Sequence, residues 1–415
     1  MNKKIKILVI PSDNFGVGKF RSINPHVYIQ EHYSDLFDID IVFLKDFPQD
    51  KPLDEFLKPY DIIHIHKQLD KNCQLINMMK FLDKKVIVDV DDNYDLGDYH
   101  PLSISAKREK WADIVINHLR LADMVTTTTP IYREKLLKHN KNVKVFPNAI
   151  DPTEPQMIPK PTKSNKLRFG IVCGSSHLHD ISLLNGLTRQ LSKDILDKIQ
   201  FVLCGFDTNG TKTIFNPKTG EQVRQKIEPQ ESVWYEYEKI ITDNYSIVSL
   251  DHKRFLHLFI PQSEYPNLNE TYRRCWTKDI NHYAEHYNNI DVLLVPLKEC
   301  DFSKMKSQLK VIEAGFFNKG IIAQNFGPYT IDLKNILDKG GKIDENGNAL
   351  LVDSVKNHKQ WAKYIKLLVE NPEILEKMKV NLYNTVKDKY SIETVCKERV
   401  KTYLEMMNQG ESIDV

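Results

Sequence analysis

The chain has 415 residues, of which 41% are hydrophobic and 27% charged, a composition typical of a soluble globular protein with two or three domains. The net charge of +2 argues against a protein that binds duplex nucleic acid, because such proteins carry a strong basic excess. No stretch approaches the roughly 20 apolar residues of a transmembrane helix, and the first apolar run, Ile5–Ile10, is too short for the core of a signal peptide. The six cysteines form no CxxC pair, which argues against a zinc-knuckle or redox motif and favours a cytoplasmic protein with reduced thiols.

Over the first 150 residues or so, short β-branched runs alternate with longer amphipathic stretches. We expect strands at Ile5–Ile10, Ile39–Leu44, Ile62–His66, Val86–Val90, Met124–Thr128 and Val143–Phe146. Alternation of strands with helical patterns predicts βαβ units around one parallel sheet.

A second series of apolar runs predicts a second sheet. Its expected strands are Leu167–Cys173, Phe201–Gly205, Ile247–Leu250, Leu256–Ile260, Val292–Pro296, Ile321–Gln324 and Ala349–Val352. The polar stretch Asp207–Lys226 contains an Asn-Pro-Lys-Thr-Gly turn signal, so we expect it to form a hairpin inserted in this second half.

The segment Asp151–Asn165 contains four prolines and shows no periodicity, which is typical of a linker. The predicted fold is therefore α/β, with two Rossmann-like parallel-sheet domains that face a central cleft. We expect an N-terminal domain at 1–155 and a C-terminal domain at 166–390, with a C-terminal helix at 392–410 that crosses back to the first domain. Open parallel sheets bind ligands at the carboxyl ends of their strands, so the loops at those ends are the candidate sites.

The strongest local motif, Ser303–Gly315, follows a predicted strand and opens a helix. Helix N-termini hold phosphates well, which makes Lys306 and Ser307 candidates for binding a diphosphate. Lys306, Lys310 and Glu313 have i, i+4, i+7 spacing and are expected to share one helix face, where Lys310 and Glu313 would meet the nucleotide and its ribose. A solvated Lys/Glu face explains the same spacing equally well.

The segment Phe302–Ala314 resembles the F-N-x-x-K-S-x-L-K-x-x-E-A pattern of a bacterial and phage branch of family 4 glycosyltransferases. Further matches occur in the order and spacing typical of that branch, from about Gly16 to Tyr329. They include Gly174–Asp180, Tyr265-Pro266, Gly320–Ala323 and Phe326–Tyr329. The resemblance implies the two-Rossmann-domain fold called GT-B and the transfer of a sugar from a nucleoside-diphosphate sugar.

Three positions depart from that pattern. Ser303 stands where the branch usually has Asn, and Ile171 stands where it often has Trp. The E-x7-E of the broader family lacks its first glutamate, because Met305 occupies the position eight residues before Glu313. The contact with the donor sugar that the family gives to that first glutamate is therefore open in this chain.

The loop Gly174–Asp180 follows the first predicted strand of the second domain and has small residues with accessible N–H groups, which suits a diphosphate. The resemblance implies that Ser175 and His177 lie close to the donor phosphates. A lone histidine is more often a structural residue, and that alternative stays open.

The loop Asp13–Arg21 contains Gly16 and Gly18, which allow a ligand to approach the backbone closely. The third glycine of GxGxxG is absent, and no suitable acidic residue ends the second strand, so the sequence argues against NAD. The resemblance implies that this loop borders the donor phosphates and the acceptor, with Lys19 and Arg21 as acceptor-side contacts for an anion. An ordinary strand–helix turn is the alternative.

Asp89, Asp91 and Asp92 lie together at the end of the strand Val86–Val90. Carboxylates this close are costly unless they are solvated, hydrogen-bonded or paired with cations. The resemblance places a catalytic His or Asp at this strand end, facing the sugar, and Asp91 or Asp92 fits that role. One of the two is expected to be a helix cap or loop residue, and a DxD metal site is the disfavoured alternative.

The resemblance therefore implies a hexosyltransferase that retains the anomeric configuration, binds no metal and needs no cofactor beyond its nucleotide-sugar donor. The acceptor would be a glycan or a lipid-linked molecule. Two alternatives remain: a nucleotide-sugar 2-epimerase of the same architecture, and a non-catalytic subunit that binds nucleotide sugars.

A basic–aromatic cluster on a predicted helix of the first domain indicates weak peripheral contact with anionic lipid headgroups at the inner face of a membrane. Its members are Lys107, Arg108, Lys110 and Trp111. A solvated helix face is the more common meaning of such a cluster.

Overall fold

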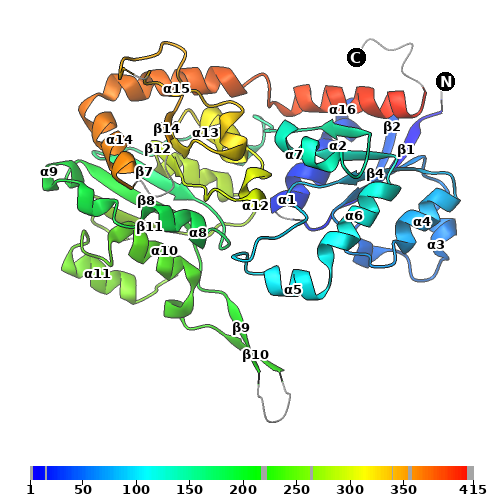
Figure 1. Ribbon diagram of the computed structural model, residues 1–415, viewed down its shortest axis with the longest axis horizontal. Coiled ribbons are helices and arrows are strands. Elements are labelled where there is room, and N and C mark those ends of the chain that lie inside the picture. Colours follow the sequence, from blue (N-terminus) through cyan, green and yellow to red (C-terminus); the bar gives the residue numbers. More distant parts are fainter. Residues whose placement is uncertain are drawn as a thin grey trace. The chain divides into compact units, whose positions relative to one another are not determined.

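The computed structural model describes residues 3–14, 16–215, 222–261, 265–338, 340–353 and 358–408. The chain divides into two compact units (Figure 1). Unit 1 comprises Met1–Pro152, Glu299–Ile312 and Val386–Val415, and unit 2 comprises Thr153–Lys298 and Glu313–Thr385. Each unit contains a six-stranded parallel sheet with alternating helices, which confirms the predicted α/β fold class.

The sheet of unit 1 has the strand order β2-β1-β3-β4-β5-β6, and all neighbouring strands are parallel. The strands are β1 (Ile5–Ile10), β2 (Phe37–Ile41), β3 (Ile62–His66), β4 (Lys85–Asp89), β5 (Met124–Thr127) and β6 (Val143–Val145). The helices are α1 (Gly16–Gly18), η1 (Lys19–Ile23), α2 (Asn24–His32), η2 (Leu44–Asp46), α3 (Leu53–Leu57), α4 (Gln74–Phe81), α5 (Ser103–Arg108), α6 (Trp111–Leu121), α7 (Pro130–Leu136), α12 (Asp301–Lys304) and α16 (Ile392–Met406). Every strand predicted for the first 150 residues overlaps one of these strands.

β1 is buried on both faces, because successive side chains of a strand point to opposite sides of the sheet. Leu8 and Ile10 belong to a core cluster with residues of α4, α6 and α7. Ile7 and Val9 belong to a second cluster, which contains Ile29 of α2 and several residues of α16. Helices from the two ends of the chain therefore cover one face of this sheet.

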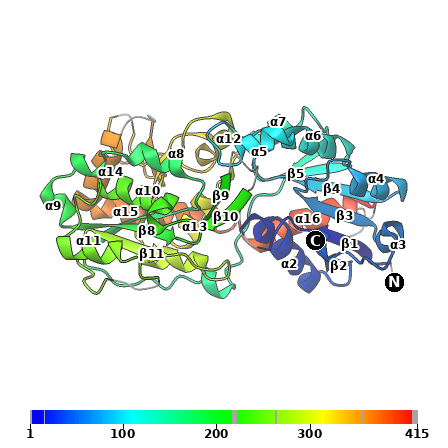
Figure 2. The ribbon, with the colours of Figure 1, turned by 90° about the horizontal axis from the view of Figure 1, so that it is seen from below.

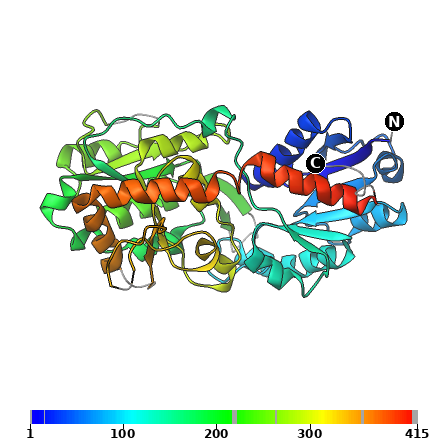
Figure 3. The same cartoon turned by 90° about the horizontal axis from the view of Figure 1, so that it is seen from above.

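α16 lies along the sheet of unit 1 in Figure 3. It begins after Ser391, whose hydroxyl caps the helix by accepting a hydrogen bond from the N–H of Thr394 (3.2 Å). The Tyr403 hydroxyl is hydrogen-bonded to Nε2 of His26 in α2 (2.8 Å). The segment before α16 is hydrogen-bonded to the segment after β6, because the N–H of Ile150 donates to the backbone oxygen of Tyr390 (2.9 Å).

The sheet of unit 2 has the strand order β11-β8-β7-β12-β13-β14, again with parallel neighbours. The strands are β7 (Leu167–Val172), β8 (Ile199–Phe206), β11 (Tyr272–Trp276), β12 (Val292–Val295), β13 (Gly320–Gln324) and β14 (Leu350–Val352). The main helices are α8 (Leu178–Ile181), α9 (Lys193–Leu196), α10 (Val233–Thr242), α11 (Leu250–His257), α13 (Leu309–Phe316), α14 (His358–Glu370) and α15 (Pro372–Val386). In Figure 1, α8 and α10 lie on one side of this sheet, and α13 and α15 lie on the other.

The predicted hairpin insertion is present as the antiparallel pair β9 (Thr211–Phe215) and β10 (Gln222–Lys226). Its predicted turn at 216–220 lies outside the described residues.

Two strands predicted for unit 2 are wrong. Ile247–Leu250 and Leu256–Ile260 flank or enter α11, which begins after Ser249, a cap whose hydroxyl accepts from the N–H of His252 (3.2 Å). The sheet instead gains β11 at its outer edge, beside β8 (Figure 2). Arginines interrupt the apolar pattern of β11, but Arg274 is buried because Glu238 pairs with it (2.6 Å).

Candidate functional site

Acidic and basic side chains meet at the carboxyl ends of β1, β3 and β4 in unit 1. Nε2 of His66 lies 3.4 Å from Oδ1 of Asp91, and Nζ of Lys67 lies 3.7 Å from the same oxygen. The Ser12 hydroxyl is hydrogen-bonded to Nδ1 of His66 (2.9 Å), which fixes the orientation of the ring. Burial alone would raise the pKa of Asp91, but Lys67 and His66 outweigh it and hold that pKa well below its usual range. We call Ser12, His66, Lys67, Asp91 and Asp92 the carboxylate cluster.

Asp89, two residues earlier, belongs to the core of unit 1. Its carboxylate binds Nε and Nη2 of Arg21 (2.9 and 2.6 Å) and accepts a hydrogen bond from the Thr126 hydroxyl (2.5 Å). Both side chains of this ion pair are fully buried. Burial opposes ionisation of Asp89, but Arg21 lowers its pKa overall.

This pairing corrects the sequence-based role of Arg21. A guanidinium that is buried and bound to Asp89 has no surface for an acceptor anion, so Arg21 acts as a structural residue that anchors the loop after β1 to β4. The side chain of Lys19, the other predicted acceptor-side contact, is largely buried at the start of η1.

The structure requires glycine at positions 16 and 18 of the same loop for different reasons. Gly16 has φ +46°, a left-handed conformation that favours glycine, and an added Cβ would have no atom within 4 Å. A Cβ on Gly18 would lie 2.1 Å from the backbone oxygen of Asp13, so Gly18 is required by the fold of its own loop. Only Gly16 has the open backbone that a ligand could approach.

The carboxylate cluster forms part of the lining of a 360 Å³ cavity within unit 1. Most of the remaining lining is aromatic or aliphatic, and it includes Val17, Leu96, Leu102, Trp111 and Phe302. A cavity of this size lies within the range of small-molecule sites, which are mostly apolar with a few convergent polar groups.

In unit 2, the Gly174–Asp180 loop follows β7 as predicted. Nδ1 of His177 is bound to Oδ2 of Asp180 (2.7 Å), whose other oxygen accepts from the N–H of Lys298 (2.8 Å). The Tyr237 hydroxyl accepts from the N–H of His177 and donates to the oxygen of Ser175 (both 2.8 Å). These hydrogen bonds fix the loop on its buried side, while Gly174, Ser175 and Ser176 are exposed to solvent.

Glu313 is fully buried in unit 2 and accepts hydrogen bonds from Tyr283 (2.6 Å) and Tyr287 (2.5 Å). Tyr329, at the end of the Phe326–Tyr329 match, is buried in unit 2 and is influenced by the charges of both Glu313 and Asp180. Burial raises the pKa of Tyr329, and the negative charges of Asp180 and Glu313 raise it further. The structure therefore places Glu313, Tyr329 and Asp180 in one region of unit 2.

Lys306, Lys310 and Glu313 do not share a helix face as predicted. α12 ends at Lys304, and α13 begins only at Leu309, so Lys306 and Ser307 lie in the connection between two helices. The ammonium of Lys306 lies 4.9 Å from the centre of the Phe302 ring, and the Ser307 hydroxyl accepts from Asn148 (3.2 Å). Lys310 occupies the first turn of α13 and is partly exposed.

Sequence reasoning missed several residues of these sites: His66, Lys67, Tyr283, Tyr287 and Tyr237. His66 and Lys67 could have been found, because they end a predicted strand next to the one that ends in the aspartates. Lys67 also adopts φ +40°, a strained conformation for a lysine that is often found at functional positions. The tyrosines had no such signal, since they reach Glu313 and the His177 loop from distant parts of the chain.

No group of three or more His, Cys, Asp and Glu side chains is arranged to hold a metal ion among the residues that the structure describes. Asp89 and Asp91, the carboxylates of the alternative metal site, are paired with Arg21 and with Lys67 and His66.

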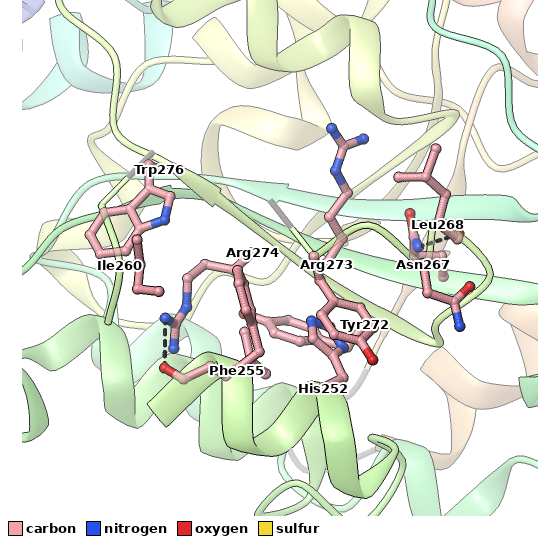
Figure 4. Close-up of a pocket in the computed structure, with 12 residues that line it drawn as sticks. His252, Phe255, Ile260, Asn267, Leu268, Tyr272, Arg273, Arg274 and Trp276 are labelled. Atoms are coloured by element: carbon pink, nitrogen blue, oxygen red, sulfur yellow. Dashed lines mark hydrogen bonds between the residues drawn. The ribbon is translucent and has the colours of Figure 1, made fainter. Parts of the chain in front are cut away.

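The cavity drawn in Figure 4 lies beside β11 in unit 2 and measures only 20 Å³, room for about one water molecule. Arg274 crosses it, donates to the backbone oxygen of Leu256 (2.9 Å) and stacks on Phe206 at 3.9 Å. A cavity of 20 Å³ has no room for a nucleotide.

The basic–aromatic cluster of unit 1 is largely neutralised by its own neighbours. Lys107 pairs with Asp98, Arg108 pairs with Glu109 (3.0 Å), and the indole N–H of Trp111 donates to Glu109 (3.1 Å). Among the described helices, none is long and apolar enough to cross a lipid bilayer.

No protein-family model and no curated protein sequence matches the chain. Solved structures share its fold: HepE of Anabaena in complex with UDP and glucose has a TM-score of 0.61 at 12% identity over 97% of this chain and 100% of that one. A glycosyltransferase from Rickettsia africae has a TM-score of 0.58 at 12% identity over 97% and 99% of the two chains. A UDP-N-acetylglucosamine 2-epimerase assigned in Listeria monocytogenes has a TM-score of 0.53 at 11% identity over both whole chains.

These likenesses define the class of fold, which is GT-B, the arrangement of two Rossmann-like domains predicted from the sequence. Of these three structures, that of HepE contains UDP and glucose, the Rickettsia protein is described as a glycosyltransferase, and the Listeria protein is described as an epimerase.

Proposed function

We propose that the protein is a glycosyltransferase that moves a hexose from a nucleoside-diphosphate sugar to a hydroxyl of an acceptor. The observation that carries the proposal is the carboxylate cluster at the carboxyl end of the unit 1 sheet, in a chain with the GT-B fold. Sheet ends of this kind bind ligands in open α/β domains. HepE structures contain UDP and UDP-glucose, so we propose a uridine diphosphate donor.

In this proposal unit 2 binds the nucleotide. The exposed backbone of Gly174–Ser176 with His177 approaches the diphosphate. Glu313 binds the ribose when the ribose hydroxyls replace those of Tyr283 and Tyr287 on its buried carboxylate.

Lys306, Ser307 and Lys310, which belong to unit 1, remain candidate contacts of the phosphates and the nucleotide. Gly16 gives close backbone approach at the loop after β1.

Asp91 supports the transition state. Glycosyl transfer proceeds through an oxocarbenium-like sugar, and a carboxylate that stays ionised favours that positive charge. Lys67 and His66 keep Asp91 ionised and hold its orientation. Asp92 is more exposed than Asp91 and serves as the loop residue of the pair.

We further propose that the anomeric configuration is retained. Both nitrogens of His66 have partners, Ser12 and Asp91, so this ring is not placed as a general base for the acceptor. A retaining enzyme can instead let a departing phosphate oxygen take the acceptor proton. Proton NMR of the product reads the anomeric coupling directly, and an inverted product would overturn this mechanism.

The experiment that tests the function is release of UDP from UDP-glucose, measured with and without candidate acceptors. Acceptor-dependent release supports a transferase, whereas no release with tight UDP binding would leave a non-catalytic binding subunit.

A 2-epimerase is the second candidate, favoured by the whole-chain likeness to the Listeria protein. Incubation with UDP-N-acetylglucosamine followed by NMR distinguishes the two candidates. An epimerase changes the configuration of the sugar at C2, whereas a transferase leaves that configuration unchanged in the free or transferred sugar.

Divalent metal is not required in this proposal, since basic side chains and backbone N–H groups offset the charge of the diphosphate. We expect UDP release to continue at an unchanged rate in EDTA. If EDTA abolishes activity and manganese or magnesium restores it, Asp89 and Asp91 become the candidate metal ligands.

A further inference from the structure

Ser175 and Ser176 form a turn shortly after the end of β7 in unit 2, and both residues are exposed to solvent. Their N–H groups make no backbone hydrogen bond to any part of the chain that the structure describes. We call Gly174–His177 the β7 turn. Successive N–H groups without partners in a turn suit an anion, provided that the backbone keeps its shape.

The hydroxyl of Tyr237 in α10 supports the backbone of the β7 turn. It accepts a hydrogen bond from the N–H of His177 and donates one to the backbone oxygen of Ser175 (both 2.8 Å). The backbone oxygen of Gly174 lies 3.3 Å from the same hydroxyl. Burial raises the pKa of Tyr237, so the hydroxyl stays a protonated donor. One hydroxyl therefore joins both ends of the turn.

Tyr237 is itself fixed by its surroundings. Its side chain is fully buried, and the ring of Trp234 packs edge-on against it with 5.2 Å between the ring centres. Trp234 lies against Gly205 of β8, where φ is +102°. A Cβ on Gly205 would lie 2.8 Å from the indole ring and 3.1 Å from the backbone oxygen of Cys173. The packing of α10 on the sheet therefore sets the position of the hydroxyl.

The side chain of His177 has a separate support. Its Nδ1 is bound to Asp180 (2.7 Å), and Asp180 accepts from the N–H of Lys298 (2.8 Å). These bonds hold the imidazole ring, whereas Tyr237 bonds only to backbone atoms of the turn. Loss of the Tyr237 hydroxyl should therefore change the backbone of the turn and leave the bond between His177 and Asp180 in place.

We propose that Tyr237 is a positioning residue for the diphosphate of the donor, because its hydroxyl holds the β7 turn with the N–H groups of Ser175 and Ser176 available to phosphate oxygens. The inference rests on the proposed function, since that function brings the diphosphate to this turn. A turn that is ordered beforehand binds its ligand without the entropic cost of ordering the backbone.

Tyr237→Phe removes the hydroxyl and keeps the ring. Because the turn loses two hydrogen bonds, we expect the dissociation constant of UDP to rise about tenfold in calorimetry. Uridine, which has no phosphate, should bind the variant as it binds the unmodified protein in an NMR titration. An equal loss for the two compounds, or no loss for UDP, would overturn the role of Tyr237.

Tyr235→Phe is the matched control. Tyr235 is a partly buried tyrosine of the same helix, and its ring contacts Tyr245 and Phe259. We expect this variant to bind UDP and uridine with unchanged affinity. A loss of UDP affinity equal to that of Tyr237→Phe would show a general effect of α10 and would contradict the proposal. Circular dichroism checks that both variants fold.

Amide hydrogen exchange followed by NMR tests the support without a variant. In the unmodified protein without nucleotide, the N–H of His177 should exchange about tenfold or more slowly than the N–H of Ser176, because only the former has a partner in Tyr237. UDP should then slow the exchange of Ser176. Equal exchange at the two positions would overturn the inference even if Tyr237→Phe does not fold.

The inference and the proposed function fail in different ways. Slow exchange at His177 in a protein that does not bind UDP would refute the proposed function, and with it the role of Tyr237 in binding. Equal UDP affinity of Tyr237→Phe and the unmodified protein would refute only the role of Tyr237.

Discussion

Asp91 of unit 1 and Glu313 of unit 2 are both buried carboxylates, but their surroundings differ. Asp91 has the cation of Lys67 and the ring of His66 beside it, whereas Glu313 accepts hydrogen bonds from Tyr283 and Tyr287. Burial and the charge of Glu313 raise the pKa of both tyrosines well above the usual range, so they stay protonated donors. The surroundings of Asp91 keep it ionised, which suits a carboxylate that stabilises positive charge. The surroundings of Glu313 consist of hydroxyl donors, which suits a carboxylate that binds hydroxyl groups.

The largest effect should come from removing a cation of unit 1. Arg21→Met leaves Asp89 buried without its guanidinium partner, and breaking a buried ion pair in this way costs about 3–5 kcal/mol. Urea unfolding followed by circular dichroism measures the loss. Arg108→Met, which breaks an exposed ion pair, should lower the free energy of unfolding by less than about 0.5 kcal/mol. Equal losses in the two variants would show that the buried pair contributes no extra stability.

Asp91→Asn tests the catalytic side of the comparison. It removes the charge while keeping the shape, and we expect turnover to fall about 10²- to 10³-fold with nearly unchanged affinity for UDP. The measurements are the rate of UDP release and calorimetry with UDP. Asp92→Asn should lower turnover far less, and the opposite ranking would assign the catalytic role to Asp92.

Tyr287→Phe removes one hydrogen-bond donor from Glu313 and leaves part of a buried carboxylate unsatisfied. We expect unit 2 to lose about 1–3 kcal/mol of stability, less than Arg21→Met takes from unit 1. The same urea experiment serves here. Tyr383→Phe, at an exposed tyrosine of α15, is the control, and an unchanged unfolding midpoint in Tyr287→Phe would show that its hydroxyl is dispensable.

The pH dependence of unit 1 supplies the most gradual effect. Burial lowers the pKa of His26 and His64 well below the usual value of 6.5, and the positive charges around them add to this. The folded state binds fewer protons, so the stabilisation is fully present above pH 6.5 and is lost as the pH falls, by up to about 1.4 kcal/mol per pH unit for each histidine.

Urea unfolding between pH 8 and pH 5 measures this slope. His64→Met should flatten it, and His32→Met, at an exposed histidine of α2, should leave it unchanged. A slope that does not respond to His64→Met would exclude this histidine as its source.

The strand–helix alternation was enough to predict both parallel sheets, because buried parallel strands are continuous apolar runs. It failed at β11, where Arg274 breaks the run and is neutralised by Glu238, a residue of another element. The same limit applies to the site. Asp91 and the His177 loop end predicted strands and could be proposed, but the partner of Arg21 and the tyrosines on Glu313 are set by tertiary contacts that no local pattern encodes.

The place of α16 in unit 1 has a consequence for how the protein is made. During synthesis the ribosome releases β1 to β6 long before α16, so the face of the sheet that holds Ile7 and Val9 stays partly uncovered while the whole of unit 2 is translated. All six strands of unit 2 precede α16 in the chain, so unit 2 can complete its sheet during that interval. The nascent chain therefore finishes its second half first, and the half that begins translation is the last to close its core.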